Sequence, residues 1–309
     1  MDLRQLRHFL AVADTLHFGR AAERLGMTQP PLSQSIMALE RELGAPLFTR
    51  SKRHVALTDF GRQWLDHVRP AVEGIAELPE VARRLLGGTS GRLALSFVST
   101  ADYSVLPRLV QDYSAAYPDV EMMLEEATSD LQVAALLDRR IDAGIVIATE
   151  AMLPPELTYR PLLREPLAAA VPEAWVEEGR FSLADDRLEG DGWMELPLII
   201  FPARVAPDFH ALVLDFYRSH GRQAQVRQEA IQMQTIISLV SAGMGLALVP
   251  ASLRHLRRTG VRYLSLARTA PTLETGLAWR RDDDKPTLSG FLRIAAAVAT
   301  MAKPSPGNP

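Results

Sequence analysis

The dipeptide Pro30-Pro31 is the feature that most limits how the start of this chain can fold. Proline lacks a backbone N–H, so it fits only in the first turn of a helix, where that donor has no intrahelical partner. Thr28 is a suitable N-cap just before it, and Gly44 is a suitable stop. Between them, apolar residues recur at spacings of four, three and four: Leu32, Ile36, Leu39 and Leu43. The pattern predicts a helix from Gln29 to Leu43.

Two further amphipathic segments precede this helix. Residues 2–16 and about 19–25 both carry apolar side chains at helical spacing, and the second segment ends at Gly26. Two helices joined by a glycine-containing turn are typical of a helix-turn-helix, whose second helix enters the major groove of DNA. The exposed glutamines and serines of 29–35 suit base and phosphate contacts. A protein-interaction module with the same fold remains the alternative.

A small basic spot follows the third helix. Residues 47–50 and 54–58 alternate in polarity around the tip Ser51-Lys52-Arg53, which predicts a two-stranded wing. Over 1–58, eight basic and five acidic side chains leave a net charge of +3, although the whole chain carries −3. We therefore expect the phosphate-binding charge to be confined to this first domain, and the rest of the chain to be acidic.

A long helix is expected next. Thr58 is an N-cap, and Leu65, Val68, Val72, Ile75 and Leu78 repeat at roughly heptad spacing within 59–87. Such a row suits pairing with a second copy, and packing on its own domain is the alternative. Pro79 is expected to kink or divide the helix. The glycine-rich residues 88–91 then predict a hinge.

The remainder, 92–303, indicates an α/β fold. Apolar runs at 93–98, 145–147, 198–201 and 246–249 predict buried strands, with a further strand at 121–126 and helical patterns at 104–117, 129–140, 207–220 and 232–242. This alternation predicts mostly parallel sheets, whose ligands bind beyond the carboxyl ends of the strands. Ser99, Thr100 and Thr128 fall there and could hold a carboxylate. Their alternative role is to cap the helices that follow.

Several other functions are disfavoured. The chain has no cysteine, and its seven histidines show no metal-ligand spacing, so we expect no metal and no thiol chemistry. We find no cofactor fingerprint and no nucleophile–base pair, so we expect no cofactor and no enzyme activity. No apolar run could span a bilayer and no signal peptide is evident, which predicts a cytoplasmic protein without a membrane partner. An α/β enzyme or solute-binding protein with an accessory helical module is the second hypothesis.

The stretch AAERLGMTQPPLSQSIMALERELGAPLF, within 3–58, closely resembles the winged helix-turn-helix of LysR-type transcriptional regulators. The resemblance implies a DNA-binding regulator and a winged helix-turn-helix at 1–58. By this similarity the DNA contacts come from Gln29, Pro30, Pro31, Ser33, Gln34 and Ser35 in the groove, with Arg50 and Arg53 at the wing. Many members carry arginine at position 34. Glutamine there is expected to shift base preference from guanine towards adenine, or to weaken a phosphate contact.

The second part resembles the branch of this family that senses aromatic compounds, through FVSTADYSVLPRL, EEATSDLQVAALLDRRIDAGIV, IIFPARVAPDFHALVLDFY and SLVSAGMGLALVPASL. This implies a two-lobed domain similar to periplasmic binding proteins, with lobe I at about 92–163 and 268–303 and lobe II at about 164–267. The implied effector contacts are Ser99, Thr100, Thr128, Ile147, Phe201, Pro202 and Ala203.

The same resemblance bears on the effector and the partners. Muconate-sensing members hold a second carboxylate with arginine at the place of Ile147, so a dicarboxylate is disfavoured here. A monocarboxylate, an uncharged aromatic or another small metabolite fits better. The implied partners are double-stranded DNA, this effector, and RNA polymerase. A second copy joined through the long helix is implied too, with a homotetramer as a dimer of dimers.

Overall fold

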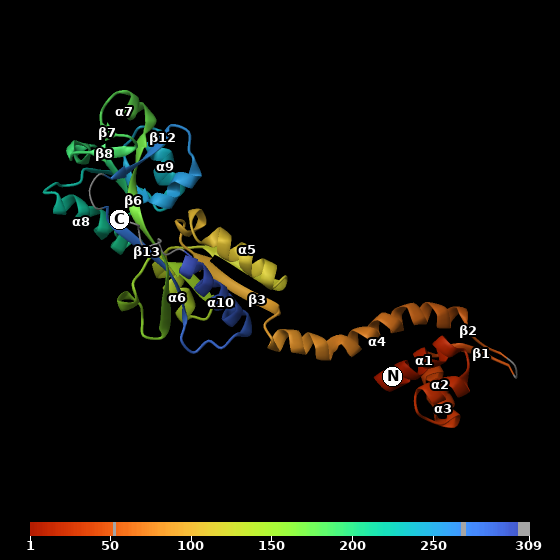
Figure 1. Cartoon of the computed structure of the whole chain (residues 1–309). Helices are drawn as coiled ribbons and strands as arrows, with labels where there is room; N and C mark the ends of the chain where they lie inside the picture. The colour runs from red at the N-terminus through yellow and green to blue at the C-terminus, as the bar shows by residue number, and fades with distance from the viewer. Residues whose placement is uncertain (52–53, 267–269, 302–309) are drawn as a thin grey trace. The chain divides into compact units, whose positions relative to one another are not determined.

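The computed structural model describes residues 1–51, 54–266 and 270–301, and the chain divides into two compact units, Met1–Arg84 and the chain from Leu85 onward (Figure 1). The first is helical with one small hairpin, and the second is mixed α/β. No helix in the described ranges is both long and apolar enough to cross a membrane.

Three short helices form the head of the first unit. They are α1 (Leu3–Thr15), α2 (Phe18–Arg24) and α3 (Gln29–Leu43). Helix α1 begins with a capping box between Asp2 and Gln5. Helix α3 begins and ends at the predicted residues, because its prolines occupy the first turn and Gly44 adopts a left-handed φ of 71°. Thr28 holds the N-cap position without a side-chain hydrogen bond.

The wing and the long helix complete this unit. Strands β1 (Phe48–Arg50) and β2 (Val55–Leu57) pair antiparallel, and α4 (Asp59–Leu86) is one helix that Pro79 does not divide. Val68 and Val72 are buried in the core of the head. Ile75 and Leu78 are 41% and 58% exposed. The first part of the heptad row therefore packs on its own unit, and the later part remains open.

Lobe I of the second unit has a sheet in the order β4-β3-β5-β13-β6. Its strands are β3 (Ser90–Phe97), β4 (Asp119–Glu126), β5 (Ala143–Val146), β13 (Thr272–Arg280) and the first half of β6 (Leu157–Pro172). Side chains alternate between the two faces of this sheet. Leu93 and Leu95 pack with helices α5 (Leu106–Ala116) and α10 (Pro286–Met301) on one face. Ala94 packs on the other face, with helix α6 (Ser129–Leu137). Each face therefore has its own apolar core.

Lobe II is built on the second half of β6, which pairs with β11 (Ala247–Pro250) and β12 (Val261–Leu266). Helices α8 (Pro207–Ser219) and α9 (Met233–Ser241) bury Phe209, Val213 and Ile236 in its core. Its remaining elements are α7 (Glu173–Glu177), β7 (Ser182–Ala184), β8 (Arg187–Glu189), β9 (Leu198–Ile200) and β10 (Val226–Glu229). Short 3₁₀ turns are η1 (Ala101–Tyr103), η2 (Glu150–Met152), η3 (Gly192–Glu195) and η4 (Ala251–Leu256).

Two expectations for this unit need correction. Strand β3 pairs parallel with β4 and β5, and β9 with β10, but β6 and β13 run antiparallel to their neighbours, so the sheets are mixed rather than mostly parallel. The expected hinge at 88–91 is partly strand, because Ser90 and Gly91 already pair with β4. Gly88 packs so closely on Pro286 that an added Cβ would lie 2.6 Å from its backbone.

Candidate functional site

Helix α3 presents a polar row at its N-terminal end. Gln29, Pro30, Pro31 and Gln34 are exposed, and Ser33 is half-buried. The first-turn N–H groups of a helix have no intrahelical partners and carry partial positive charge, which favours a phosphate. The predicted groove-reading residues therefore share one accessible end of α3, apart from Ser35.

Ser35 is directed toward the interior of the head. Its Oγ lies 2.8 Å from Nδ1 of His8 on α1, and both side chains are at least partly buried. Burial lowers the pKa of His8, and Arg4 lowers it further, which favours the neutral ring. This contact gives Ser35 a role in packing α3 on α1.

Arg50, at the end of β1, is fixed above α3 by three contacts. Its guanidinium lies 2.8 Å from Oε2 of Glu40, over the Phe18 ring at 4.8 Å from the ring centre, and 3.5 Å from Oγ of Ser33. The wing strand is thereby joined to the helix that carries the polar row. Arg53, the other predicted wing residue, lies outside the described residues.

The second unit contains a cavity of about 540 Å³ between its lobes. Its lobe I wall comes from the segments that follow β3, β4 and β5, and its lobe II wall from those that follow β9 and β10. Carboxyl ends of parallel strands meet at one edge of a sheet, which explains why these segments converge. A volume of this size accommodates a small molecule.

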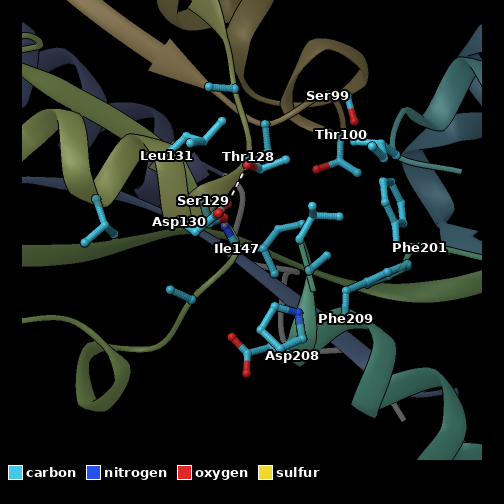
Figure 2. A pocket seen from close by; sticks show the side chains of 18 of the residues that line it. Ser99, Thr100, Thr128, Ser129, Asp130, Leu131, Ile147, Phe201, Asp208 and Phe209 are labelled. Carbon is cyan, nitrogen blue, oxygen red and sulfur yellow. Dashed lines mark hydrogen bonds between the residues drawn. The ribbon is translucent and has the colours of Figure 1, made fainter. Parts of the chain in front are cut away.

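Five of the seven residues predicted as effector contacts line this cavity: Ser99, Thr100, Thr128, Ile147 and Phe201. Figure 2 shows the hydroxyl-bearing residues of lobe I facing the phenyl rings of Phe201 and Phe209. Pro202 and Ala203 are not among the lining residues. Pro202 is buried and Ala203 is exposed in a turn, and the chain returns to the cavity at Val205.

The lining hydroxyls do not cap helices. Thr128 and Thr100 occupy N-cap positions of α6 and η1, yet neither makes a side-chain cap hydrogen bond. The Thr128 hydroxyl donates to Oδ1 of Asp130, and Oγ of Ser129 accepts the N–H of Ile147 at 3.1 Å. Thr100 is 2% exposed, and its Oγ1 has no hydrogen-bond partner among the described residues. A buried, unpaired hydroxyl beside a cavity is available to a bound molecule.

Replacing Thr100 by valine is expected to stabilise the unliganded protein. Valine has the same shape and removes the desolvation penalty of the unpaired hydroxyl, so the free energy of unfolding should rise by about 1 kcal/mol. Thr287→Val is the matched control, because the buried Thr287 hydroxyl donates to the Arg92 carbonyl at 3.1 Å. Thermal unfolding should shift upward for Thr100→Val and downward for Thr287→Val. A downward shift for both variants would contradict the unpaired state of Thr100.

The structure also adds lining residues that the sequence patterns did not single out: Glu126, Asp130, Asp208 and Gln232. Asp130 and Asp208 lie in the first turns of α6 and α8, where acidic residues are common for reasons of helix stability. From the sequence alone, a role of Asp130 and Asp208 at the cavity could therefore not be distinguished from a role in stabilising the helix N-terminus. Within the described ranges, no cluster of three or more potential metal ligands occurs.

Known protein families match both units. Residues 3–62 match the bacterial regulatory helix-turn-helix protein, lysR family, and residues 86–300 match the LysR substrate binding domain. The chain belongs to the LysR family of transcriptional regulators. This LysR-family regulator is thus a DNA-binding protein with an effector-binding domain, and not an enzyme.

Relatives of this LysR-family regulator match over nearly their whole length. It is 59% identical over 295 residues to the HTH-type transcriptional regulator IlvR of Caulobacter vibrioides, covering 95% of this chain and 97% of that protein. It is 36% identical to AlsR of Bacillus subtilis, covering 99% of both. Among solved structures it resembles full-length CbnR complexed with its target DNA, with a TM-score of 0.76, 25% identity, and coverage of 97% of this chain and 100% of that one.

Proposed function

We propose that α3 reads an operator sequence in the major groove through its exposed N-terminal residues. The observation that carries this proposal is the accessible polar row of Gln29, Ser33 and Gln34, next to Pro30 and Pro31. Glutamine makes bidentate contacts to adenine, and serine bonds a base or a phosphate. Arg50 and Arg53 are assigned to the wing side, with Arg50 acting from its position between Glu40 and Ser33.

The cavity between the lobes is the proposed effector site. Ser99, Thr100 and Thr128 supply polar groups, and Ile147 and Phe201 supply apolar surface. A ligand shifts a conformational equilibrium only through different affinities for its two states. Effector binding is therefore proposed to favour one angle between the lobes, and so one spacing of the DNA-binding heads in the oligomer.

The oligomer is proposed to form through α4. Ile75 and Leu78 remain exposed at heptad spacing, which suits a partner helix from a second copy. A homodimer joined in this way, paired again into a homotetramer, presents several α3 helices to successive half-sites. We place this assembly in the cytoplasm, in contact with RNA polymerase at regulated promoters.

A nuclease footprint on the DNA upstream of its own gene and the divergent neighbouring gene tests the proposal. We expect protected segments spaced by whole turns of the double helix, because each dimer engages two half-sites on one face. The absence of any protected segment at protein concentrations that bind random DNA would contradict operator recognition.

Replacing Gln29 by alanine is expected to weaken specific operator binding by about 1–3 kcal/mol, roughly a factor of 5 to 150, because a base-edge contact is lost. Binding to random DNA, which depends on phosphate contacts and salt, should change little. Gln63→Ala is the matched control, since Gln63 is exposed on α4. Equal loss of specific and random binding in Gln29→Ala, measured by fluorescence anisotropy, would argue against base reading.

A further inference from the structure

The cavity is acidic as well as apolar. Its described lining includes Glu126, Asp130 and Asp208 but no lysine, arginine or histidine. No lysine, arginine or histidine of the described lining is therefore available to pair with these three side chains. Asp130 comes from α6 in lobe I and Asp208 from α8 in lobe II, so both walls contribute negative charge (Figure 2). Along the described wall of this cavity, an anion meets carboxylates and no compensating positive side chain.

The helix ends do not offset this charge. Helices α6 and α8 both begin at the cavity, and a helix N-terminus ordinarily favours an anion. Here the first turn of each helix already contains a carboxylate of the chain itself, Asp130 or Asp208. The negative charge of these side chains opposes the approach of a second anion to the two helix ends.

The hydroxyl groups of Thr128 and Thr100 also favour a positively charged ligand that donates hydrogen bonds. An ionised carboxylate only accepts hydrogen bonds, so Thr128 uses its single hydroxyl hydrogen on Asp130 and offers lone pairs to the cavity. Thr100 provides an independent observation, because its Oγ1 is buried, unpaired and at the cavity wall. Both oxygens can accept hydrogen bonds from a ligand N–H.

From these observations we propose that the effector carries an ammonium group on a small apolar body. The inference rests on the proposed function, in which this cavity is the effector site. The ammonium group is placed among Asp130, Thr128 and Thr100, and the body against Ile147, Phe201 and Phe209. The sequence-based expectation of a simple monocarboxylate is the competing hypothesis. A free amine and the ammonium end of an amino acid share this chemistry.

Calorimetry with the full chain tests the charge preference. The probes are amines, alcohols and carboxylates built on the same three skeletons, benzyl, cyclohexylmethyl and 2-methylpropyl, together with the amino acids that bear these groups as side chains. We expect the amine to bind at least about tenfold more tightly than its matched alcohol, because it gains attraction to the carboxylates, and the carboxylate to bind least. An amino acid that binds more tightly than its amine identifies a zwitterion as the effector type, and the reverse order identifies a simple amine.

The variant E126Q/D130N/D208N separates charge from shape. It should bind the amine about tenfold more weakly and the alcohol unchanged, since only the Coulombic attraction is removed. Glu189→Gln is the matched control, because Glu189 is exposed on β8 and does not line the cavity. If the triple variant fails to fold, E126Q and D208N are measured singly. T100V should also weaken amine binding, although it is expected to stabilise the unliganded chain.

Three results would overturn the inference: no amine of the set binds, a carboxylate binds as tightly as its amine, or the neutralised variant keeps the full preference. None of these results affects the operator footprint. A normal footprint that responds to an anionic compound leaves the proposed function intact and removes the ammonium ligand. A missing footprint removes the proposed function itself.

Discussion

Glu40→Ala is expected to lower the free energy of unfolding of the first unit by about 3 kcal/mol, because it leaves two buried backbone N–H groups and the Arg50 guanidinium without their shared acceptor. Oε1 of Glu40 accepts the backbone N–H groups of Leu47 and Phe48, at 2.9 and 3.2 Å, and Oε2 pairs with Arg50. The Glu40 side chain is only 16% exposed, so water replaces it poorly. One carboxylate thus holds the start of the wing and its arginine against α3.

Glu40→Ala should also reduce the affinity for the operator, beyond the loss that unfolding alone would cause. Without Glu40, the Arg50 guanidinium loses its fixed position beside Ser33, so operator binding should weaken even in molecules that remain folded. Amide hydrogen exchange across 44–50, followed by mass spectrometry, reports the local loosening. Glu40→Gln keeps an acceptor for the two amides and should lie between wild type and Glu40→Ala. Exchange no faster in Glu40→Ala than in Glu23→Ala, an exposed glutamate of α2, would contradict this role.

The second large effect is expected from Gly276→Ala in β13. A Cβ built on Gly276 would lie 2.2 Å from Cζ of Tyr159, a buried side chain on the neighbouring strand β6. Overpacking of this kind costs about 1–3 kcal/mol and more when backbone must move. For a domain of this size the loss corresponds to a fall in the melting temperature of roughly 2–12 °C.

This substitution should also reach the cavity. Oη of Tyr159 donates to the carbonyl of Ala148 at 2.6 Å, and Ala148 is a lining residue. Displacing the ring therefore displaces part of the cavity wall. Gly192→Ala is the matched control, because nothing lies within 4 Å of its added Cβ. In the double variant Gly276→Ala/Tyr159→Val the overlap is removed, so the two changes should cost less together than the sum of their single effects. Simple additivity would show that the contact is not the cause.

The sequence predicted α3 to the residue because its limits depend on local chemistry. Pro30, Pro31 and Gly44 act on the backbone next to them, and no distant contact is required. Strands β6 and β13 were not predicted. The β6 sequence contains Pro161 and Pro166, which normally count against a strand. Both prolines lie in the first half of β6, where it is the edge strand and needs a partner only on the β13 side. This edge position, which makes the two prolines acceptable, is known only from the folded sheet.

The site was predicted in the same uneven way. Position after a strand was enough to select Ser99, Thr100 and Thr128, and each of these residues lines the cavity. The charge of the cavity was not predicted, because Glu126, Asp130 and Asp208 come together from two lobes. The contact between Glu40 and Arg50 was missed for a similar reason, since the wing must fold back on α3 to create it. The role of the cavity residues in effector binding and the role of Arg50 in DNA binding remain predictions.

Strand β6 is shared by the two lobes. Its first half pairs with β13 in lobe I, and its second half pairs with β11 and β12 in lobe II (Figure 1). Both halves are held in hydrogen-bonded sheets, so a change of angle between the lobes must twist or bend β6 itself. The stiffness of this one strand is therefore expected to affect how readily the lobes exchange between their two arrangements, in addition to the contacts made in the cavity.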